Sequence, residues 1–394
     1  MIYMDNVAGT KIDSRVLKKM MPFFEDKYGN PSAHFYPIGR ESYEAISESR
    51  KAVSTLINAS FNEIIFTSSG TESNNLAIKG ILPQKELENK KHIIISEIEH
   101  LSIQNIAAKL LNEGYKITKL KVDNYGCIDP DDLRKAITKN TAMVSIMHAN
   151  PEIGTIQDIK GIGEICRNHN IVFHVDAVAS CGHIPVNVAT FNCDLLSISA
   201  QNFYGPKGAA ALYIKKGTPI SPLFDGGYQE MGIRSGSENV PAIVGMGEAA
   251  NIVMEEMPLY SKKMELLGEK LWEGLDDKID FIHFTGNPKK RLPGHVSFWV
   301  EYIEGESLLL WFSLKGICAA SGSACSSNIL SEDEEGLKAS YILTAVGVPN
   351  DICAGSLMFS MSKYNKEEDV DYVLSTAPEI VKRLSEMSPE YRKN

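Results

Sequence analysis

The chain has 394 residues, a formal net charge of −10 and an ordinary globular composition, with 43% hydrophobic and 23% charged residues. An acidic balance argues against nucleic acid as the main partner, because neutralising phosphates requires clustered Lys and Arg. No apolar run approaches the roughly eighteen residues of a membrane span, and the N-terminus lacks a signal-peptide pattern. We therefore expect a cytoplasmic protein that binds neither nucleic acid nor membranes.

The first two thirds of the chain predict one large α/β domain. Helices are expected at 14–28 and 39–56, before an alternation of strands and helices begins at residue 63. The strands are predicted at 63–67, 91–96, 115–121, 142–148, 171–175, 195–198 and 209–214, with helices after Ser68, from Ser102, at 130–139 and at 157–169. This alternation predicts a mostly parallel, doubly wound sheet, whose ligands bind at the carboxyl ends of the strands.

The last third of the chain predicts a second, smaller domain. A long charged helix is expected from about Pro258, followed by strands at 280–285 and 295–300 and helices at 307–314 and 367–387. A chain of this length is expected to divide in two. We predict a large domain over 16–257 and a small α+β domain made of 1–15 with 258–394.

The segment Ser68–Asn75, SSGTESNN, follows a strand and opens a helix. Its small residues, Gly70 and Thr71 among them, would let backbone N–H groups approach an anion, and the helix dipole would add to the attraction. A strand-to-helix turn capped by Ser or Thr explains the same residues. The segment alone does not decide between a phosphate site and a capped turn.

Two titratable residues follow predicted strands. His100 could stack on a planar ligand or act as an acid or base, or it could be a surface residue in a loop. Asp176 ends the next such strand, and a buried carboxylate there needs a donor partner. A protonated pyridine ring would serve, as would a helix N-terminus or a structural ion pair.

The segment Asp194–Gly208 runs from an apolar strand into a tight Tyr-Gly-Pro-Lys-Gly turn. This arrangement presents a side chain at a strand end. The presented residues here are Gln201 and Asn202, which are neutral amides. A reactive group would be expected at such a position in a large α/β chain.

Two Gly/Ser-rich segments complete the candidate site. In Gly226–Val240, Arg234 and Ser237 could reach an anion across a dimer interface, or the segment could be a solvated loop. In Cys318–Asn328, Cys325 has small polar neighbours and is interpreted as a nucleophile or soft-metal ligand. No CxxC pair occurs, and we interpret four thiols in or beside predicted elements as core or bystander residues: Cys127, Cys166, Cys181 and Cys193.

Taken together, these segments resemble the cysteine desulfurases of the NifS/IscS kind, which are pyridoxal-phosphate (PLP) enzymes of the class V aminotransferase group with fold type I. The resemblance covers nearly the whole chain. The similar segments are GNPSAH, FTSSGTESNNLAIKG, EH at 99–100, VSIMHANPEIGTIQDI, FHVDA, DLLSIS with YGPKGAAALYI, RSGSENV, IEGESLLL and SGSACSS. The resemblance implies a homodimer with active sites near the dimer interface, and a role in iron–sulfur assembly with a scaffold partner.

The resemblance also assigns roles to residues. Gly70, Thr71 and Ser199 match the phosphate cup, and Ser237 matches a contribution to the cup from the other subunit. His100 matches the residue that stacks on the pyridine ring, and Asp176 the partner of the ring nitrogen. Cys325 matches the cysteine that accepts sulfur as a persulfide.

Five positions depart from the family pattern around the cofactor. Asn202 occupies the position of the Schiff-base lysine, and an amide can neither form an imine with PLP nor act as the base that moves substrate protons. Met358 stands where an Arg would bind the substrate carboxylate. The other departures are Gln201 for a phosphate-contacting His, Pro151 for an Asn and Ala179 for a Gln. Lys207 belongs to the family's own turn and is expected to point elsewhere.

Three hypotheses follow. In the favoured one, the chain resembles a lysine-less, IscS-like branch without desulfurase activity. Cys325 then supplies a thiolate to an iron–sulfur cluster shared with an IscU-type scaffold, and free sulfide supplies the sulfur. In the second, PLP is held non-covalently and the protein is an active desulfurase. In the third, the protein is a non-catalytic regulator of the scaffold, and its charged C-terminal helix is the docking element.

Overall fold

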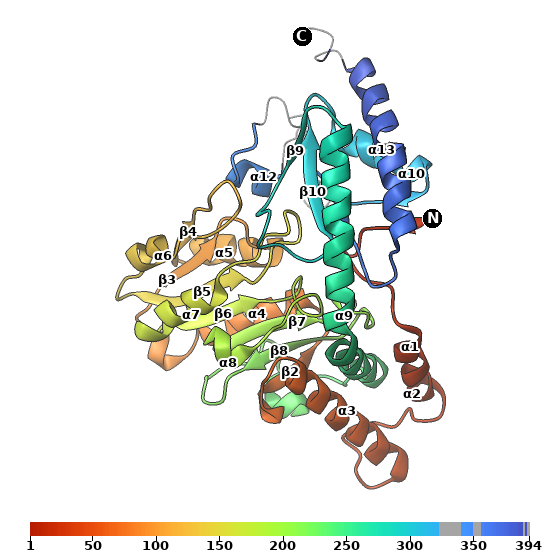
Figure 1. Ribbon diagram of the computed structural model, residues 1–394. Helices are drawn as coiled ribbons and strands as arrows, with labels where there is room; N and C mark the ends of the chain where they lie inside the picture. Colours follow the sequence, from red (N-terminus) through yellow and green to blue (C-terminus); the bar gives the residue numbers. More distant parts are fainter. Residues whose placement is uncertain (323–339, 350–355, 389–390, 392–394) are drawn as a thin grey trace.

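The computed structural model describes residues 1–322, 340–349, 356–388 and 391. Within this part of the chain the large sheet has seven strands in the order β2-β8-β7-β6-β5-β3-β4 (Figure 1). The strands are β2 (Ile64–Thr67), β3 (His92–Ser96), β4 (Lys116–Leu120), β5 (Thr141–Met147), β6 (Val172–Asp176), β7 (Leu195–Ser199) and β8 (Ala210–Ile214). All are parallel except β8, which is antiparallel to both of its neighbours. The predicted α/β fold is therefore confirmed.

Successive residues of these strands alternate between two hydrophobic cores. In β2, Ile64 and Phe66 belong to one core and Ile65 to the other. Strand side chains point to opposite faces of a sheet, so nearly continuous apolar strands require cover on both faces. Helices α4 (Gly70–Ile81) and α5 (Leu101–Asn112) pack in one core, and α3 (Pro37–Leu56), α7 (Ile159–Asn168) and α9 (Val240–Lys278) pack in the other.

A smaller sheet lies beyond the large one, at the top of Figure 1. It has the antiparallel order β12-β10-β9, formed by Leu357–Ser360, His295–Val300 and Ile282–Phe284. The N-terminal strand β1 (Ile2–Tyr3) pairs in parallel with β11 (Ile317–Cys318) beside this sheet. The first residues of the chain therefore lie with its last third, whereas the division into the two ranges given above stays a prediction.

Helix α9 connects the two regions and differs from the expectation. It begins at Val240, where the Asn239 side chain accepts from the N–H of Ala242, and continues without a break through Pro258. Proline removes one helical hydrogen bond, to the carbonyl of Met254, and Met254 is exposed to solvent. The upper half of α9 packs against α13 (Glu367–Met387), and the lower half against α1 and α3.

The helix expected at 14–28 is also divided. It forms α1 (Ser14–Met20) and α2 (Pro22–Glu25), because Pro22 supplies no N–H and begins a new helix. The remaining elements are α6 (Pro130–Ala136), α8 (Val188–Phe191), α10 (Gly305–Leu314), α12 (Tyr341–Ala345), η1 (Phe61–Glu63), η2 (Lys85–Leu87), η3 (Ala200–Asn202) and η4 (Gln229–Gly232).

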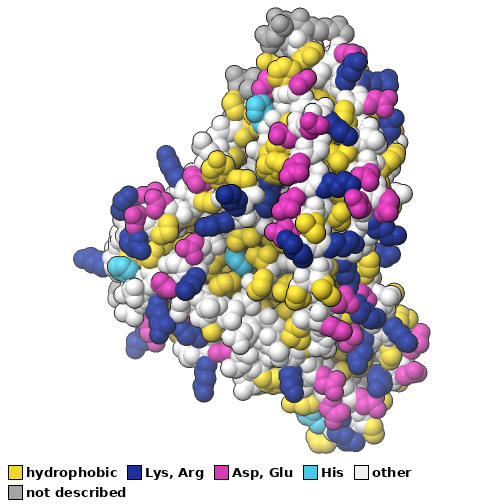
Figure 2. All heavy atoms as spheres, viewed as in Figure 1, with side chains coloured by type: hydrophobic (Ala, Val, Ile, Leu, Met, Phe, Trp, Pro, Cys, Tyr) yellow, Lys and Arg dark blue, Asp and Glu magenta, His cyan; other side chains and the backbone are white. Residues whose placement is uncertain are grey.

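Surface charge is mixed on the face shown in Figure 2. Side chains of both signs are interspersed, including over the region of α9 and α13. Among the helices of the described residues, none combines the length and the apolar character that crossing a membrane would require.

Candidate active site at the carboxyl edge of the sheet

The sheet order brings together motifs that are far apart in the sequence. Strands β2, β7, β6, β5 and β3 are mutually parallel, so their carboxyl ends meet at one edge. Asp176 at the end of β6 is in register with Met147 of β5 and Ser197 of β7. Ser199 ends β7, and the segment leading to Gly70 follows β2. This edge is the place where the ligands of doubly wound sheets bind.

The turn before α4 combines the two interpretations left open above. Ser69 is the N-cap, and its side chain accepts from the N–H of Glu72. Both the N–H and the hydroxyl of Ser68 donate to the Glu72 carboxylate. Gly70 is held close to its neighbour, because a Cβ there would lie 2.6 Å from a methyl of Val178. The turn is therefore capped. Thr71 is exposed in the first turn of α4, and the N-terminus of this helix can bind an anion.

Asp176 is the buried end of a continuous chain of hydrogen-bonded side chains. Its two carboxylate oxygens accept from the Asn74 side chain at 2.7 Å and from the N–H of Val178 at 3.0 Å. Asn74 also donates to the Ser102 hydroxyl at 2.9 Å, and that hydroxyl lies 2.8 Å from Nδ1 of His100. Asp176 and Asn74 are buried, so the chain fixes the carboxylate rigidly.

His100 forms the exposed end of that chain. It is the N-cap of α5, where Nδ1 accepts from the N–H of Ser102 at 3.1 Å. The hydrogen bonds fix the plane of the imidazole and leave its face free. His100 is thus a surface residue with an ordered ring, which is the geometry that stacking on a planar ligand requires.

The presentation turn is bonded to the N-terminal segment through the side chain of Asn202 and the backbone of Gln201. The Asn202 side chain is buried and donates to the carbonyl of Val7 at 3.1 Å, while its own Oδ1 has no partner in the described structure. The carbonyl of Gln201 accepts from both the N–H and the hydroxyl of Thr10. The amide nitrogen of Asn202 is therefore occupied as a hydrogen-bond donor. Lys207 is exposed and lies beside Gly9.

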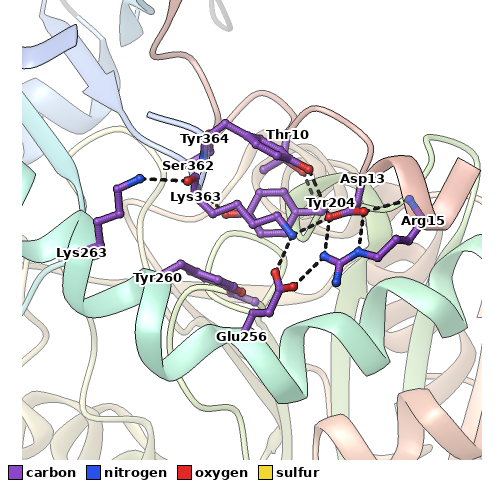
Figure 3. A network of polar contacts seen from close by, with 11 residues as sticks. Thr10, Asp13, Arg15, Tyr204, Glu256, Tyr260, Lys263, Ser362, Lys363 and Tyr364 are labelled. Atoms are coloured by element: carbon purple, nitrogen blue, oxygen red, sulfur yellow. Dashed lines mark hydrogen bonds and ion pairs between the residues drawn. The ribbon is translucent and has the colours of Figure 1, made fainter. Parts of the chain in front are cut away.

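A charged network includes Asp13 and Arg15, which follow the N-terminal segment that contacts Asn202 (Figure 3). Lys363 contacts the carboxylates of Asp13 at 2.6 Å and Glu256 at 2.8 Å, and Arg15 bridges the same two carboxylates. The Lys363 ammonium lies 4.6 Å from the centroid of the Tyr204 ring. Hydrogen bonds from Arg15 and Lys363, which outweigh burial, hold the pKa of Asp13 well below its ordinary value. The network thereby joins the N-terminal segment, α9 and the chain before α13.

Glu99 is a buried carboxyl group beside Asp176. Its Oε1 accepts from the Ser96 hydroxyl at 2.5 Å and from the N–H of Met147 at 3.0 Å, whereas Oε2 has no partner among the described residues. Burial, with a smaller contribution from the charge of Asp176, raises the pKa of Glu99 to about 8. Burial therefore favours the neutral form of Glu99, and the side chain joins the ends of β3 and β5.

Glu152 is a second buried carboxyl group, in the turn after β5. The hydroxyls of Ser340 and Ser356 donate to it, and a Cβ at Gly322 would collide with it. Burial raises the pKa of Glu152 to about 7, although the two serines oppose the change. Glu152 thus contacts the chain on both sides of residues 323–339. Cys325 itself lies outside the described residues.

Arg234 links the Gly/Ser-rich segment to the cup. Its Nε donates to the Glu72 carboxylate at 2.9 Å, and hydrogen bonds from Arg234 and Ser68 overcome burial to lower the pKa of Glu72. Glu230 is buried in the same segment and forms a bidentate ion pair with Arg50. Ser237 is exposed, and no hydrogen bond joins it to Gly70 or Thr71 within the described chain. Its expected contribution to a partner's cup stays a prediction.

The structure also shows where the other positions that differ from the family pattern lie. Met358 is buried in β12 and exchanges backbone hydrogen bonds with Ala320. The Pro151 carbonyl accepts from His295 at 2.9 Å, and Ala179 is partly exposed three residues after Asp176. Of the four thiols interpreted as core or bystander residues, Cys166, Cys181 and Cys193 are buried in the core and Cys127 is partly exposed. Among the described residues no His, Cys, Asp and Glu cluster could hold a metal ion.

Several site residues were missed from the sequence. Asn74 and Ser102 complete the Asp176 chain. Asn74 lies in the Ser68–Asn75 segment, which was identified for other residues, and Ser102 lies at the predicted start of a helix. Asn74 follows Gly70 by one helical turn, which is a signal that could have been used. Glu152 carried no such signal, because its partners Ser340 and Ser356 are distant in the sequence.

The chain is similar to known proteins over nearly its whole length. The model of the class V aminotransferase family matches residues 2–373. The chain is 48% identical over 395 residues to the cysteine desulfurase IscS of Methanosarcina thermophila, covering 99% of this chain and 95% of that one. It is 41% identical to cysteine desulfurase IscS 1 of Archaeoglobus fulgidus over the full length of both. A solved NifS-like protein superposes with a TM-score of 0.89 at 36% identity, covering 97% of this chain and all of the other.

The fold and the sheet-edge site thus define a PLP-type α/β protein of fold type I. The chain belongs to the class V aminotransferase family, in its branch of IscS- and NifS-type cysteine desulfurases.

The residues fit PLP in part. Asp176 is buried and anchored and retains lone pairs for a protonated ring nitrogen, His100 offers an ordered ring face, and the start of α4 suits a phosphate. When bound, PLP acts as an electron sink for carbanion chemistry. Asn202 does not fit covalent attachment, because an amide is not a nucleophilic amine. The described residues therefore offer non-covalent contacts to PLP, and position 202 offers no amine.

Proposed function

We propose that this chain is an IscS-like protein of iron–sulfur cluster assembly that does not release sulfur from cysteine by the family's Schiff-base chemistry. One observation carries the proposal. Asn202, at the position that the family resemblance gives to the Schiff-base lysine, is a buried amide whose nitrogen donates to Val7. Met358, at the position of the substrate-binding arginine, is a buried thioether in β12. Both changes remove groups that act directly on the substrate.

In this proposal Cys325 supplies a thiolate ligand to a cluster that is assembled on an IscU-type scaffold. The cluster is cargo, and free sulfide supplies its sulfur. Thiolates are the usual protein ligands of iron–sulfur clusters. Contacts of Glu152 with Ser340 and Ser356 support the proposal, because they tie chain that flanks the Cys325 segment to the sheet edge.

We propose that the protein acts as a homodimer. Aromatic side chains project from the region of α1 to α3 and from the segment that carries Ser237: Phe35 is 96% exposed and Tyr228 is 94% exposed. Large exposed aromatics of this kind mark interaction surfaces. A mass measurement by light scattering tests the dimer, and Phe35→Asp with Tyr228→Asp is expected to shift the protein toward the monomer.

Anaerobic reconstitution tests the cluster role. The protein is mixed with the scaffold, ferrous iron and sulfide, and the cluster yield and visible spectrum are compared for wild type and Cys325→Ala. Cys127→Ala is the control, because Cys127 is a partly exposed thiol of the described chain. Loss of cluster in Cys325→Ala alone supports the proposal. Unchanged yield and spectrum contradict it, and a scaffold complex that persists without any cluster favours a non-catalytic regulator.

The intact Asp176 chain favours a second candidate, an active desulfurase that holds PLP non-covalently. Its carboxylate, Asn74, Ser102 and His100 form one connected set of hydrogen bonds. Sulfide release from cysteine, measured with added PLP, separates the candidates. Robust turnover that Asp176→Ala abolishes would establish the second candidate and overturn the first.

A further inference from the structure

The side chains between Asp176 and His100 form hydrogen bonds in one direction, which the carboxylate sets. An ionised carboxylate only accepts hydrogen bonds, so the Asn74 atom that lies 2.7 Å from Asp176 is the amide nitrogen. The same nitrogen lies 2.9 Å from the Ser102 hydroxyl and donates its second proton there. The amide oxygen of Asn74 is buried and has no partner among the described residues. Asn74 therefore contributes two donors and no acceptor to the chain of side chains.

The Ser102 hydroxyl continues this direction to the imidazole of His100. Its oxygen accepts from Asn74, so its own proton is free to donate, and Nδ1 of His100 lies 2.8 Å away. The backbone N–H of Ser102 donates to the same ring nitrogen at 3.1 Å. Two donors therefore meet at Nδ1, which must carry a lone pair and no proton. In a neutral imidazole the single ring proton then lies on Nε2.

This arrangement is opposite to that of a histidine that acts as a general base. In such a site Nδ1–H donates to a carboxylate, and the lone pair on Nε2 takes the proton of the reacting group. Here Asn74 and Ser102 separate His100 from Asp176, and the lone pair at Nδ1 is engaged by Ser102. Nε2 of the exposed His100 ring forms no hydrogen bond with the described residues. The nitrogen that is free for a ligand is therefore the protonated one.

We propose that His100 offers a hydrogen-bond donor, Nε2–H, to a ligand at the sheet edge, and that Ser102 is the positioning residue that fixes this tautomer. The ligand then places an acceptor on His100, such as a carboxylate or phenolate oxygen or a thiolate. In this state His100 does not remove a proton from the ligand, because its ring has no free lone pair. The inference concerns the protein without a ligand and does not depend on the proposed function.

Nuclear magnetic resonance of the full-length protein tests the tautomer. The histidine ring nitrogens are isotopically labelled, and long-range proton–nitrogen correlations at mildly alkaline pH distinguish a protonated ring nitrogen from an unprotonated one. The signals of His100 are those that His100→Gln lacks. In the wild type, Nε2 is expected to be protonated and Nδ1 unprotonated. An Nδ1–H tautomer, or an equal mixture of the two tautomers, overturns the proposal.

Ser102→Asp tests the positioning role, because it reverses the direction of the hydrogen bond to His100. The introduced carboxylate still accepts from Asn74, and it also accepts from Nδ1–H of the imidazole. The variant is therefore expected to shift His100 to the Nδ1–H tautomer, so that the two nitrogen signals exchange character. Ser102→Ala is the control, because it keeps the backbone donor to Nδ1 and with it the wild-type tautomer. An unchanged tautomer in Ser102→Asp overturns the positioning role.

A second measurement keeps the proposal testable should Ser102→Asp fail to fold. Hydrogen exchange at the backbone amide of Ser102 is expected to be about tenfold faster in His100→Leu than in the wild type, because the amide loses its acceptor at the start of α5. His100→Asn supplies an oxygen acceptor at the same N-cap and is expected to restore the slow exchange. Equal exchange in all three proteins means that Nδ1 is not the acceptor and overturns the proposal.

Discussion

Two walls of the same site differ in what they can still do. One wall holds Asp176 by contacts with Asn74 and Val178, and extends through Ser102 to His100. The other wall is the turn after β7, where Asn202 donates to a backbone carbonyl. In the proposed function, the first wall binds a protonated ring without a covalent bond, and the second wall offers no amine that could form one. The proposal therefore separates recognition of the cofactor from covalent attachment to it.

The largest expected effect comes from restoring an amine to the second wall. Asn202→Lys is expected to change PLP from a ligand without covalent attachment to one that borohydride fixes on the protein, because the first wall still orients the ring. Mass spectrometry after reduction measures the adduct. Asn202→Met, which has length without an amine, is the control. An adduct on wild-type protein, or none on the lysine variant, would remove the distinction between the walls.

The next effect weakens the first wall. Asp176→Ala is expected to reduce the affinity for added PLP on the order of tenfold to a hundredfold, since a hydrogen bond to a charged group contributes about 1.5–3 kcal/mol. Equilibrium dialysis measures the affinity. Asp176→Asn keeps the contacts with Asn74 and Val178 only in part. Its affinity for PLP is expected to lie between that of the wild type and that of Asp176→Ala. Equal affinity in all three proteins would mean that PLP is not held at this wall.

The Glu99 carboxyl group sharpens the comparison through pH. Its pKa in the folded protein, about 8, lies above the unfolded value near 4.5. Its contribution to stability is therefore complete below pH 4.5 and is lost as the pH rises through 8. Between pH 5 and 8, the free energy of unfolding of the wild-type protein is expected to fall by on the order of 3 kcal/mol because of Glu99. Glu99→Gln is expected to abolish this fall.

Urea unfolding of wild type and Glu99→Gln at the two pH values measures this effect. Asp5 and Glu152 also have a raised pKa, and they contribute equally to both proteins. The difference between the variants therefore isolates Glu99. Parallel pH profiles would show that Glu99 is ionised in the folded state.

The smallest effect concerns the support behind the second wall. Lys363→Met is expected to destabilise the protein by about 2 kcal/mol, because Asp13 and Glu256 lose a shared cation while Arg15 remains. Lys363→Arg is the control that keeps the charge. The melting temperature measures the change, and an unchanged value would show that Arg15 alone holds the N-terminal segment.

Much of the fold could be predicted from local pattern. The strands and helices of 63–214 were expected within a few residues, since apolar runs and helix signals such as Asp129 before Pro130 are local features. The errors concerned helix boundaries at proline residues, because the sequence does not show whether a proline ends a helix. Pro22 divides a predicted helix although Pro258 does not divide α9, because a helix supported by packing on both sides tolerates the loss of one hydrogen bond.

The sequence by itself determined the family, the identity of the strand-end residues and the absence of an amine at position 202, because these depend on residue type and order. Only the tertiary structure decided which of them meet. It joined Asp176 to His100 through Asn74 and placed Glu152 against Ser340. Burial and hydrogen-bond partners depend on distant parts of the chain that local periodicity does not relate.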